Sequence, residues 1–228
     1  MSTRFLEMVV RAFSFLAIRL ALLLTAYGKG NVQMRFVNTS PGESSLDYSL
    51  DGTTVASGVA YGTGSNYEST IPGSRHLQVY PSGMTNAIID QTINLSSSTN
   101  YSLVAINYSS RISSILLTDD NSMPSSANVK LRIVNASPGL GTVDAYVVTP
   151  GTNLNSVSPT ISSLAFESGS GYITESAGAW DIIFTSPGQK TALLTSSMLT
   201  LASGQIRTIV ALNGESGGYM AAVLPDLN

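Results

Sequence analysis

A serine flanked by glycines near the C-terminus is the first candidate for chemistry. The stretch "NGESGG", residues 213–218, contains Gly214-x-Ser216-x-Gly218, the spacing of a nucleophile elbow, and it is similar to the G-D-S-G-G of serine proteases. An elbow serine needs a histidine downstream of it in the chain. The single histidine, His76, lies far upstream. A hairpin loop also needs Gly and Ser, so we predict no catalytic residue and keep a serine hydrolase using Ser216 as an alternative.

The chain offers few side chains that could bind a metal ion or a cofactor. It has no cysteine and one histidine, which excludes disulfides, thiolate metal sites, cysteine nucleophiles and multi-histidine metal sites. Asp119, Asp120 and Asn121 offer three consecutive oxygen side chains to Ca²⁺, but the spaced pattern of a calcium loop is missing. A polar linker explains them more simply. We therefore predict no metal and no cofactor, and leave open whether an ion binds near Asp119–Asp120.

Two aspartates recur in similar surroundings. Asp47 stands in "SSLDYSL" and Asp144 in "GTVDAYV", and each follows a Ser-Pro-Gly turn. A carboxylate that accepts backbone N–H bonds in that turn is a simpler explanation than a paired functional role.

Tyrosines among Asn- and Ser-rich stretches are the most plausible material for recognition. A tyrosine offers a flat apolar ring with a polar tip, which suits sugars or protein partners. The same side chains could instead fill the edges of a β-sandwich. The predicted ligand surface consists of Tyr61, Tyr67, Tyr108, Tyr172 and Tyr219.

The elements that carry these residues occur twice. The phrase "RFVNTSPG" returns as "RIVNASPG", 132 − 35 = 97 positions later. Further matches follow in the same order, and the second copy has eight extra residues (105 − 97 = 8) within "VTPGTNLNSVSPT". Such collinear matches indicate an internal repeat. The further matches are 59–67 with 164–172, 80–83 with 185–188, and 93–107 with 199–213; the extra residues fall within 148–160.

Each copy reads as short strands, because apolar residues alternate in runs of four to eight between turn signals. Asp51-Gly52 is the pair that a tight hairpin favours, since glycine accepts a positive φ. In "RHLQVYP", Leu77 and Val79 share one face, and in "AWDIIFT" the residues Trp180, Ile182 and Phe184 point inward. No stretch after residue 30 has a helical period. The pattern predicts an all-β fold of two tandem antiparallel β-sandwiches.

The predicted domain boundaries follow from the repeat. The first β-sandwich covers residues 31–120 and the second covers residues 129–228. Residues 121–128 form a short, polar, proline-bearing linker, which would limit but not abolish motion between the domains.

Residues 1–28 have the pattern of a signal peptide or an N-terminal anchor. Arg4 and Arg11 precede the apolar run 12–26, which Arg19 interrupts. This run is shorter than the roughly 20 residues that span a membrane, and an arginine inside it costs about 2.5–3.5 kcal/mol. The end, "LLLTAYGKG", resembles a bacterial lipoprotein signal in which Tyr27 stands where the acylated cysteine should be, so the sequence does not support lipid anchoring.

The composition agrees with an exported β protein. Hydrophobic residues make up 43% of the chain, enough for a packed core, and charged residues only 11%, against roughly 25% in typical soluble domains. The net charge of −3 and the lack of a Lys/Arg cluster argue against a nucleic-acid partner.

At "RFVNTSPG…LDYSLDG…VAYG…Y…PG…LQVYPSG" the chain resembles the bacterial domain-of-unknown-function family 4397, once over residues 34–118 and again over 130–224. The resemblance implies sandwiches similar to immunoglobulin-like and transthyretin-like domains, in tandem copies on lipoproteins or surface proteins. It implies no common activity and no catalytic residue. Here Tyr27 replaces the expected cysteine, and the insertion 148–160 replaces the Asp-Gly turn.

The sequence as a whole indicates a non-enzymatic, extracytoplasmic protein that acts at the cell envelope as a binding or spacer module. A surface glycan or an envelope protein would be its partner, and it would touch a membrane only through a retained N-terminal segment. One alternative is a carbohydrate-binding or adhesive module, with a groove expected at the insertion 148–160. A subunit of a surface assembly is another.

Overall fold

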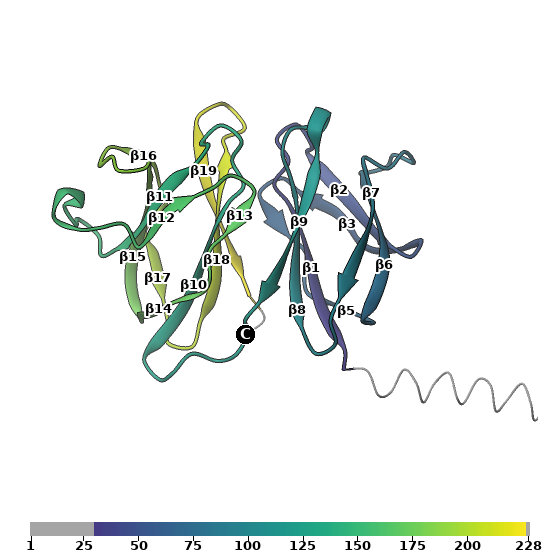
Figure 1. Cartoon of the computed structure of the whole chain (residues 1–228), viewed down its shortest axis with the longest axis horizontal. Helices are drawn as coiled ribbons and strands as arrows, with labels where there is room; N and C mark the ends of the chain where they lie inside the picture. Colours follow the sequence, from purple (N-terminus) through teal and green to yellow (C-terminus); the bar gives the residue numbers. More distant parts are fainter. Residues whose placement is uncertain (1–29, 227–228) are drawn as a thin grey trace, which may run out of the picture.

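The computed structural model describes residues 30–226 and shows an all-β protein (Figure 1). Apart from two single 3₁₀ turns, η1 (Ser109–Arg111) and η2 (Leu154–Ser156), the regular elements of this part are strands. None of its helical elements is long and apolar enough to cross a membrane. The predicted signal segment, residues 1–28, lies outside the described residues.

The N-terminal half, residues 32–119, forms two sheets. The inner sheet has the strand order β4-β1-β8-β9, with β5 also paired to β1, and the outer sheet has the order β3-β2-β6-β7. The strands are β1 (Val32–Asn38), β2 (Ser45–Leu50), β3 (Thr53–Ala60), β4 (Thr63–Gly64), β5 (Glu68–Thr70), β6 (Gly73–Pro81), β7 (Ile89–Leu95), β8 (Asn100–Ile106) and β9 (Ser113–Asp119).

The C-terminal half, residues 128–226, has the same arrangement. Its inner sheet has the order β13-β10-β18-β19, with β14 paired to β10, and its outer sheet has the order β12-β11-β15-β16, with β17 also paired to β15. The strands are β10 (Asn128–Asn135), β11 (Val143–Val148), β12 (Ile161–Leu164), β13 (Ser168–Gly169), β14 (Ile173–Ser176), β15 (Gly178–Thr185), β16 (Ala192–Thr195), β17 (Leu199–Leu201), β18 (Ile206–Asn213) and β19 (Tyr219–Pro225).

One strand pair in each inner sheet is parallel, unlike the purely antiparallel sandwich predicted from the sequence. β1 runs parallel to β8 and β10 runs parallel to β18, whereas the other pairs are antiparallel. Parallel strands need a crossover rather than a hairpin. Between β1 and β8 the chain crosses to the outer sheet and returns twice, and β8 then lies beside β1 in the same direction. Alternation in a sequence does not distinguish the two kinds of pairing.

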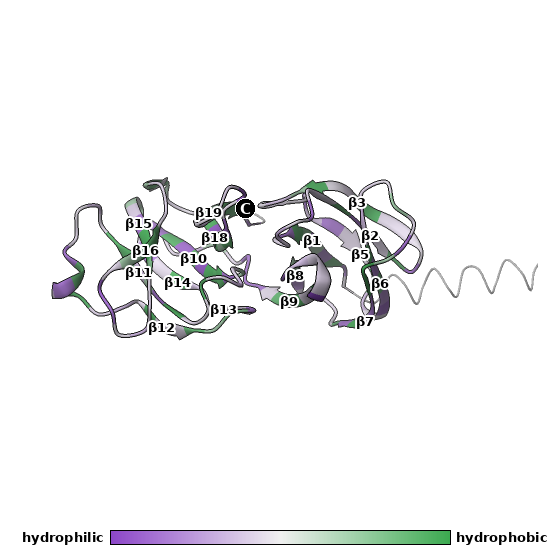
Figure 2. Ribbon diagram, turned by 90° about the horizontal axis from the view of Figure 1, so that it is seen from above, coloured by the Kyte–Doolittle hydropathy of each residue, from purple (hydrophilic) through white to green (hydrophobic). Residues whose placement is uncertain are grey.

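Each half encloses its own hydrophobic core between its two sheets. In the N-terminal half the inward residues of β1 pack against those of β2 and β6, which include Tyr48, Leu77 and Val79, all without exposed surface. In the C-terminal half Ile182 and Phe184 are fully buried as predicted, and Trp180 packs against the core while partly exposed. Figure 2 shows the resulting alternation of hydrophobic and hydrophilic residues along the strands.

A third hydrophobic cluster joins the halves, because the two inner sheets face each other in the middle of four layers (Figure 1). The central strands β1, β8, β10 and β18 are therefore buried on both faces, whereas β6 and β7 of an outer sheet alternate between buried and exposed residues. Such a packed interface opposes the motion between halves that the linker alone led us to expect. The cluster consists of Val37, Val104, Ile106, Val134, Ala136, Val210, Leu212 and Leu224.

The repeated phrase is explained by the turn after the first strand of each half. The Asn38 side chain donates to the carbonyls of Glu43 (2.9 Å) and Val59 (3.2 Å) and accepts from the Ser40 N–H (3.1 Å). Asn135 makes the equivalent bonds in the second half, to Gly141, Leu164 and Ser137. An amide is needed here because it both donates and accepts.

The Asp51-Gly52 hairpin forms as predicted. It joins β2 to β3, and both residues have positive φ, 51° and 79°. This matches the two-residue turn whose twist suits a hairpin.

Candidate functional site

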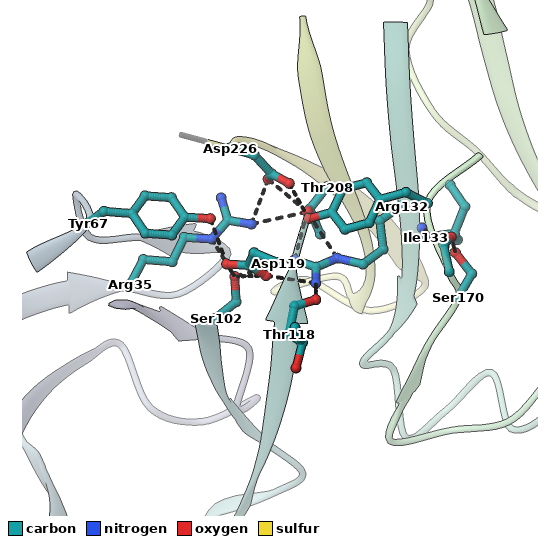
Figure 3. Close-up of polar contacts among 12 residues, drawn as sticks. Arg35, Tyr67, Ser102, Thr118, Asp119, Arg132, Ile133, Ser170, Thr208 and Asp226 are labelled. Carbon is teal, nitrogen blue, oxygen red and sulfur yellow. Dashed lines mark hydrogen bonds and ion pairs between the residues drawn. The ribbon is translucent and has the colours of Figure 1, made fainter. Parts of the chain in front are cut away.

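Four buried charges lie between the two inner sheets (Figure 3). Arg35 of β1 forms an ion pair with Asp226, at 2.7 Å between Nη2 and Oδ1. Arg132 of β10 forms one with Asp119 of β9, also at 2.7 Å, between Nη1 and Oδ1. The side chains of both arginines are 2% exposed and those of both aspartates 0%. Each pair connects the N-terminal half to the C-terminal half.

Two hydroxyl groups connect the ion pairs into one network. Arg35 donates from Nε to Ser102 (2.7 Å) and from Nη2 to Thr208 (3.0 Å). Arg132 donates from Nη2 to Ser102 (3.3 Å) and to Thr208 (3.0 Å). Ser102 in turn donates to Asp119 (2.8 Å), and Thr208 donates to Asp226 (2.8 Å).

Backbone carbonyls complete the arginine contacts: Arg35 donates to Pro225 O (2.6 Å) and Arg132 to Thr118 O (3.1 Å). A buried charge is tolerated only when it is paired and hydrogen-bonded, and each guanidinium here satisfies both conditions.

Tyr67 and Tyr172 belong to this network and not to an open surface. The Tyr67 hydroxyl donates to Asp119 Oδ2 (2.7 Å) and the Tyr172 hydroxyl donates to Asp226 Oδ2 (2.5 Å). Their rings lie over Arg35 and Arg132, with centroid distances of 5.2 and 4.9 Å. Burial raises the pKa of both phenols, so both remain hydrogen-bond donors at neutral pH. We call the eight residues the clasp: Arg35, Tyr67, Ser102, Asp119, Arg132, Tyr172, Thr208 and Asp226.

The other three predicted tyrosines meet at one end of the junction, around Asn213. Tyr61 of the first half donates to the Asn213 carbonyl (2.7 Å), and the Asn213 amide donates to the Tyr108 hydroxyl (2.9 Å). Tyr219 donates to the carbonyl of Gly139 (2.9 Å), whose N–H donates to Asn213 Oδ1 (3.2 Å). Side chains of both halves are therefore joined at this end.

A pocket of about 240 Å³ opens beside this group, and we call it the junction cleft. Residues from the turn after β1 form one wall, and the loop between β18 and β19 forms the other. Burial, together with the charge of Glu215 and the nearby Tyr108, raises the pKa of Tyr61 to about 12, so the phenol stays neutral beside two carboxylates. The lining residues are Pro41, Gly42, Glu43, Ser44, Tyr61, Gly214 and Glu215.

The residues suggested for catalysis are not brought together. Ser216 is exposed in the loop between β18 and β19 of the C-terminal half. His76 lies on the outer sheet of the N-terminal half, where its Nε2 contacts Asp90 Oδ1 at 2.7 Å. Ser216 therefore has no histidine beside it to serve as its base.

The aspartates suggested for Ca²⁺ have protein partners. Asp119 is held in the clasp, and Asp120 forms an ion pair with Lys130 at 2.7 Å. Residues 30–226 contain no group of three or more acidic or histidine side chains that could hold a metal ion.

Asp47 and Asp144 do accept backbone N–H groups, although not from the Ser-Pro-Gly turn named in the sequence interpretation. Asp47 accepts from Gly58 (2.7 Å) and from Gly83 (3.4 Å). Asp144 accepts from Ser163 (2.8 Å) and Gly188 (2.8 Å). Each aspartate therefore links its strand, β2 or β11, to the neighbouring strand, β3 or β12, and to the turn that follows β6 or β15.

The insertion at 148–160 covers part of the outer sheet of the C-terminal half and does not form the groove that the carbohydrate-binding alternative predicted there. On the outer sheet of the C-terminal half, Tyr146 is 1% exposed because the Lys190 ammonium lies over its ring (4.9 Å) and also donates to the Val157 carbonyl. In the N-terminal half the equivalent positions hold Ser49 and Thr85, and a hollow of about 330 Å³ remains open.

The residues of the clasp and of the junction cleft differ in how far the sequence repeat identifies them. Arg35 and Arg132 open the repeated phrase, so the repeat marked them. Asp226 lies beyond the matched segments. Glu43 and Glu215 are not themselves repeated, since they correspond to Leu140 and Ser109 in the other copy.

A family model for a domain of unknown function, DUF4397, matches residues 32–146, from β1 into β11. The chain belongs to this family. The match contains the whole N-terminal half, and with it Arg35, Ser102 and Asp119 of the clasp. The DUF4397 match also contains Glu43 and Tyr61 of the junction cleft.

Solved structures that resemble this DUF4397 protein do so weakly. The CBM26 carbohydrate-binding module of Amy13K from Eubacterium rectale, solved with maltoheptaose, is 10% identical over 87% of this chain and 98% of that one, with a TM-score of 0.26. The TIE protein of Bacillus anthracis is 8% identical over 84% of this chain and 34% of that one, with a TM-score of 0.27. Likeness at this level carries no argument about function. No curated protein matches the chain.

Proposed function

We propose that this chain is an exported, non-catalytic binding protein of the cell envelope, built from two immunoglobulin-like DUF4397 domains. The domains are residues 31–120 and 129–228, joined by the linker 121–128. The identical strand order of the two halves supports this division, as does the separate hydrophobic core of each half.

The observation that carries the proposed function is the junction cleft. Its walls come from both halves, so it exists only while the halves are docked. The clasp and the third hydrophobic cluster hold the walls in place without taking part in binding. A ligand site between two rigid units is a common arrangement in proteins.

The chemistry of the cleft fits a sugar. A tyrosine ring such as that of Tyr61 offers an apolar face to a pyranose, and the carboxylates of Glu43 and Glu215 accept hydrogen bonds from sugar hydroxyls. Glu43 and Glu215 have no ion-pair partner among residues 30–226. Their oxygens are therefore available to a ligand.

A glycan array on the purified protein tests this function, followed by calorimetry on any glycan that binds. Glu215→Gln removes one charged acceptor from the exposed side of the cleft, and we expect it to weaken binding about tenfold, the effect of losing one charge-assisted hydrogen bond. The matched control, Tyr80→Ala, changes an aromatic residue outside the cleft and should leave affinity unchanged. An array without a hit, or equal affinity in Glu215→Gln and the parent, would remove the cleft as a glycan site.

We also propose that residues 1–28 direct export, because basic residues precede their apolar run and Tyr27 gives no thiol for lipidation. Fractionation of the native host and mass spectrometry of the N-terminus test this. We expect a chain without residues 1–28 outside the cytoplasm, and an intact N-terminus in the membrane fraction would show a retained anchor instead.

A further inference from the structure

The contacts between the halves are reciprocal. Arg35 of the first half binds Asp226 of the second, and Arg132 of the second binds Asp119 of the first, both at 2.7 Å (Figure 3). Each arginine also donates to the hydroxyl of its own half and to that of the other half. In a two-fold symmetric interface, if one residue contacts a second, the equivalent of the second contacts the equivalent of the first. The clasp has this property throughout.

Every clasp position is chemically conserved between the halves. The equivalent pairs lie 97 to 107 residues apart, in line with the offsets of the sequence repeat. An arginine, a tyrosine and an aspartate each return unchanged, and a serine returns as a threonine, which keeps the hydroxyl. The pairs are Arg35 with Arg132, Tyr67 with Tyr172, Ser102 with Thr208, and Asp119 with Asp226.

The apolar part of the interface repeats in the same way. A Cβ added to Gly64 would lie 3.8 Å from Leu224, and a Cβ added to Gly169 would lie 3.3 Å from Leu117. A glycine at the edge of each inner sheet thus lies under a leucine of the other half. Three further pairs keep apolar side chains of similar size: Val37 with Val134, Val104 with Val210, and Ile106 with Leu212.

We infer that each half carries a self-complementary docking face, so that a half can pair with a second copy of itself as well as with the other half. The clasp groups that the first half receives from the second half, an arginine, a hydroxyl and an aspartate, are present on the first half too. In the intact chain the linker favours pairing within one molecule, because a short tether gives an effective concentration in the millimolar range. Outside that pairing, the partner that fits this face is another copy of this chain.

Cutting the linker of the full chain tests the inference. A protease recognition sequence inserted after Met123, which is 82% exposed, allows specific cleavage of the folded protein. The cleaved protein is unfolded, refolded and examined by native mass spectrometry, which separates the pairings by mass. We expect three species: the mixed pair and both like pairs. A mixed pair alone, or separate halves alone, would overturn the inference.

A substitution gives a second, quantitative test. In a pair of two N-terminal halves a change at Arg35 occurs twice, whereas in the mixed pair it occurs once. If Arg35→Gln weakens the mixed pair tenfold, the like pair should weaken about a hundredfold. The control Arg75→Gln, on the outer sheet, should change neither. A like pair that weakens no more than the mixed pair would show that it forms through another face.

Discussion

At the scale of single residues, the buried charges determine how the halves are matched. A buried ion pair contributes little net stability compared with a well-packed apolar pair, but loss of one partner leaves an unpaired charge in a dry site. Arg35 is such a charge. Burial alone would lower the pKa of Arg35, but the nearby Asp226, Tyr67 and Asp119 raise it overall. Arg35 therefore stays charged, and its charge needs a negative partner in the buried site.

Removal of that partner should therefore be costly. We predict that Asp226→Asn lowers the free energy of unfolding by about 3–5 kcal/mol, measured by urea denaturation. Asp51→Asn is the matched control, because Asp51 pairs with Arg75 at the surface (side chain 47% exposed) and such pairs contribute about 0–1 kcal/mol. Equal losses in the two variants would mean that the clasp is not a dry, closed network.

The pair between Asp120 and Lys130 gives a prediction for pH. Hydrogen bonds from Lys130 and Ser122 lower the pKa of Asp120 to about 2. A lowered folded-state pKa means that the ionised form favours the fold above the ordinary value, and that this contribution disappears as the pH falls through about 2. The contribution is small, since the Asp120 side chain is 53% exposed.

Carbon-13 NMR of the Asp120 carboxyl group measures this pKa directly. We expect a midpoint near 2 in the parent protein and a higher midpoint in Lys130→Ala. An unchanged midpoint in Lys130→Ala would mean that the lysine does not hold this carboxylate.

Whether the burial of a residue could be predicted depended on how far along the chain its contacts lie. The inward faces of β6 and β15 follow from alternation alone, so Leu77, Val79, Ile182 and Phe184 were placed correctly. The role of Arg35 depends on a residue 191 positions away. Alternation puts Arg35 on the face opposite the core, where a single domain would be in water, and only the second half explains why that face is buried.

At the scale of elements, the two outer sheets have diverged while the inner sheets have kept the same contacts. The sequence placed the insertion 148–160 correctly but not its effect. In the structure this insertion folds back over its own sheet. The Val157 carbonyl in the insertion accepts a hydrogen bond from Lys190, which also donates to the Tyr146 hydroxyl. No local pattern shows that a loop folds back over its own sheet.

This covering predicts unequal effects of the same substitution at a tyrosine of each outer sheet. Tyr146→Ser places in the second half the residue that Ser49 provides in the first, and we expect it to lower the free energy of unfolding by about 3 kcal/mol, because a buried ring is lost. Tyr80→Ser, beside the open hollow of the N-terminal half, should cost less than about 1 kcal/mol. Urea denaturation of both variants gives the comparison, and the reverse order would show that Tyr146 is not covered.

At the scale of the whole molecule, four layers of sheet form one unit. The repeat in the sequence predicted two sandwiches and the linker between them. It did not predict how the sandwiches meet, because residues such as Val104 and Val210 read equally well as ordinary strand residues. Their burial follows only when two copies are placed face to face, since that contact is made between segments about 100 residues apart.

The most direct test of this arrangement is the distance between the outer sheets. The chain has no cysteine, so Thr92→Cys on β7 and Thr195→Cys on β16 place two spin labels specifically at exposed positions. Double electron–electron resonance then reports the distribution of distances between them. Docking through the clasp and the third hydrophobic cluster predicts one narrow distribution in the parent and a broader one in Asp226→Asn. A broad distribution in the parent would contradict it, since the halves would then move as separate domains on a linker.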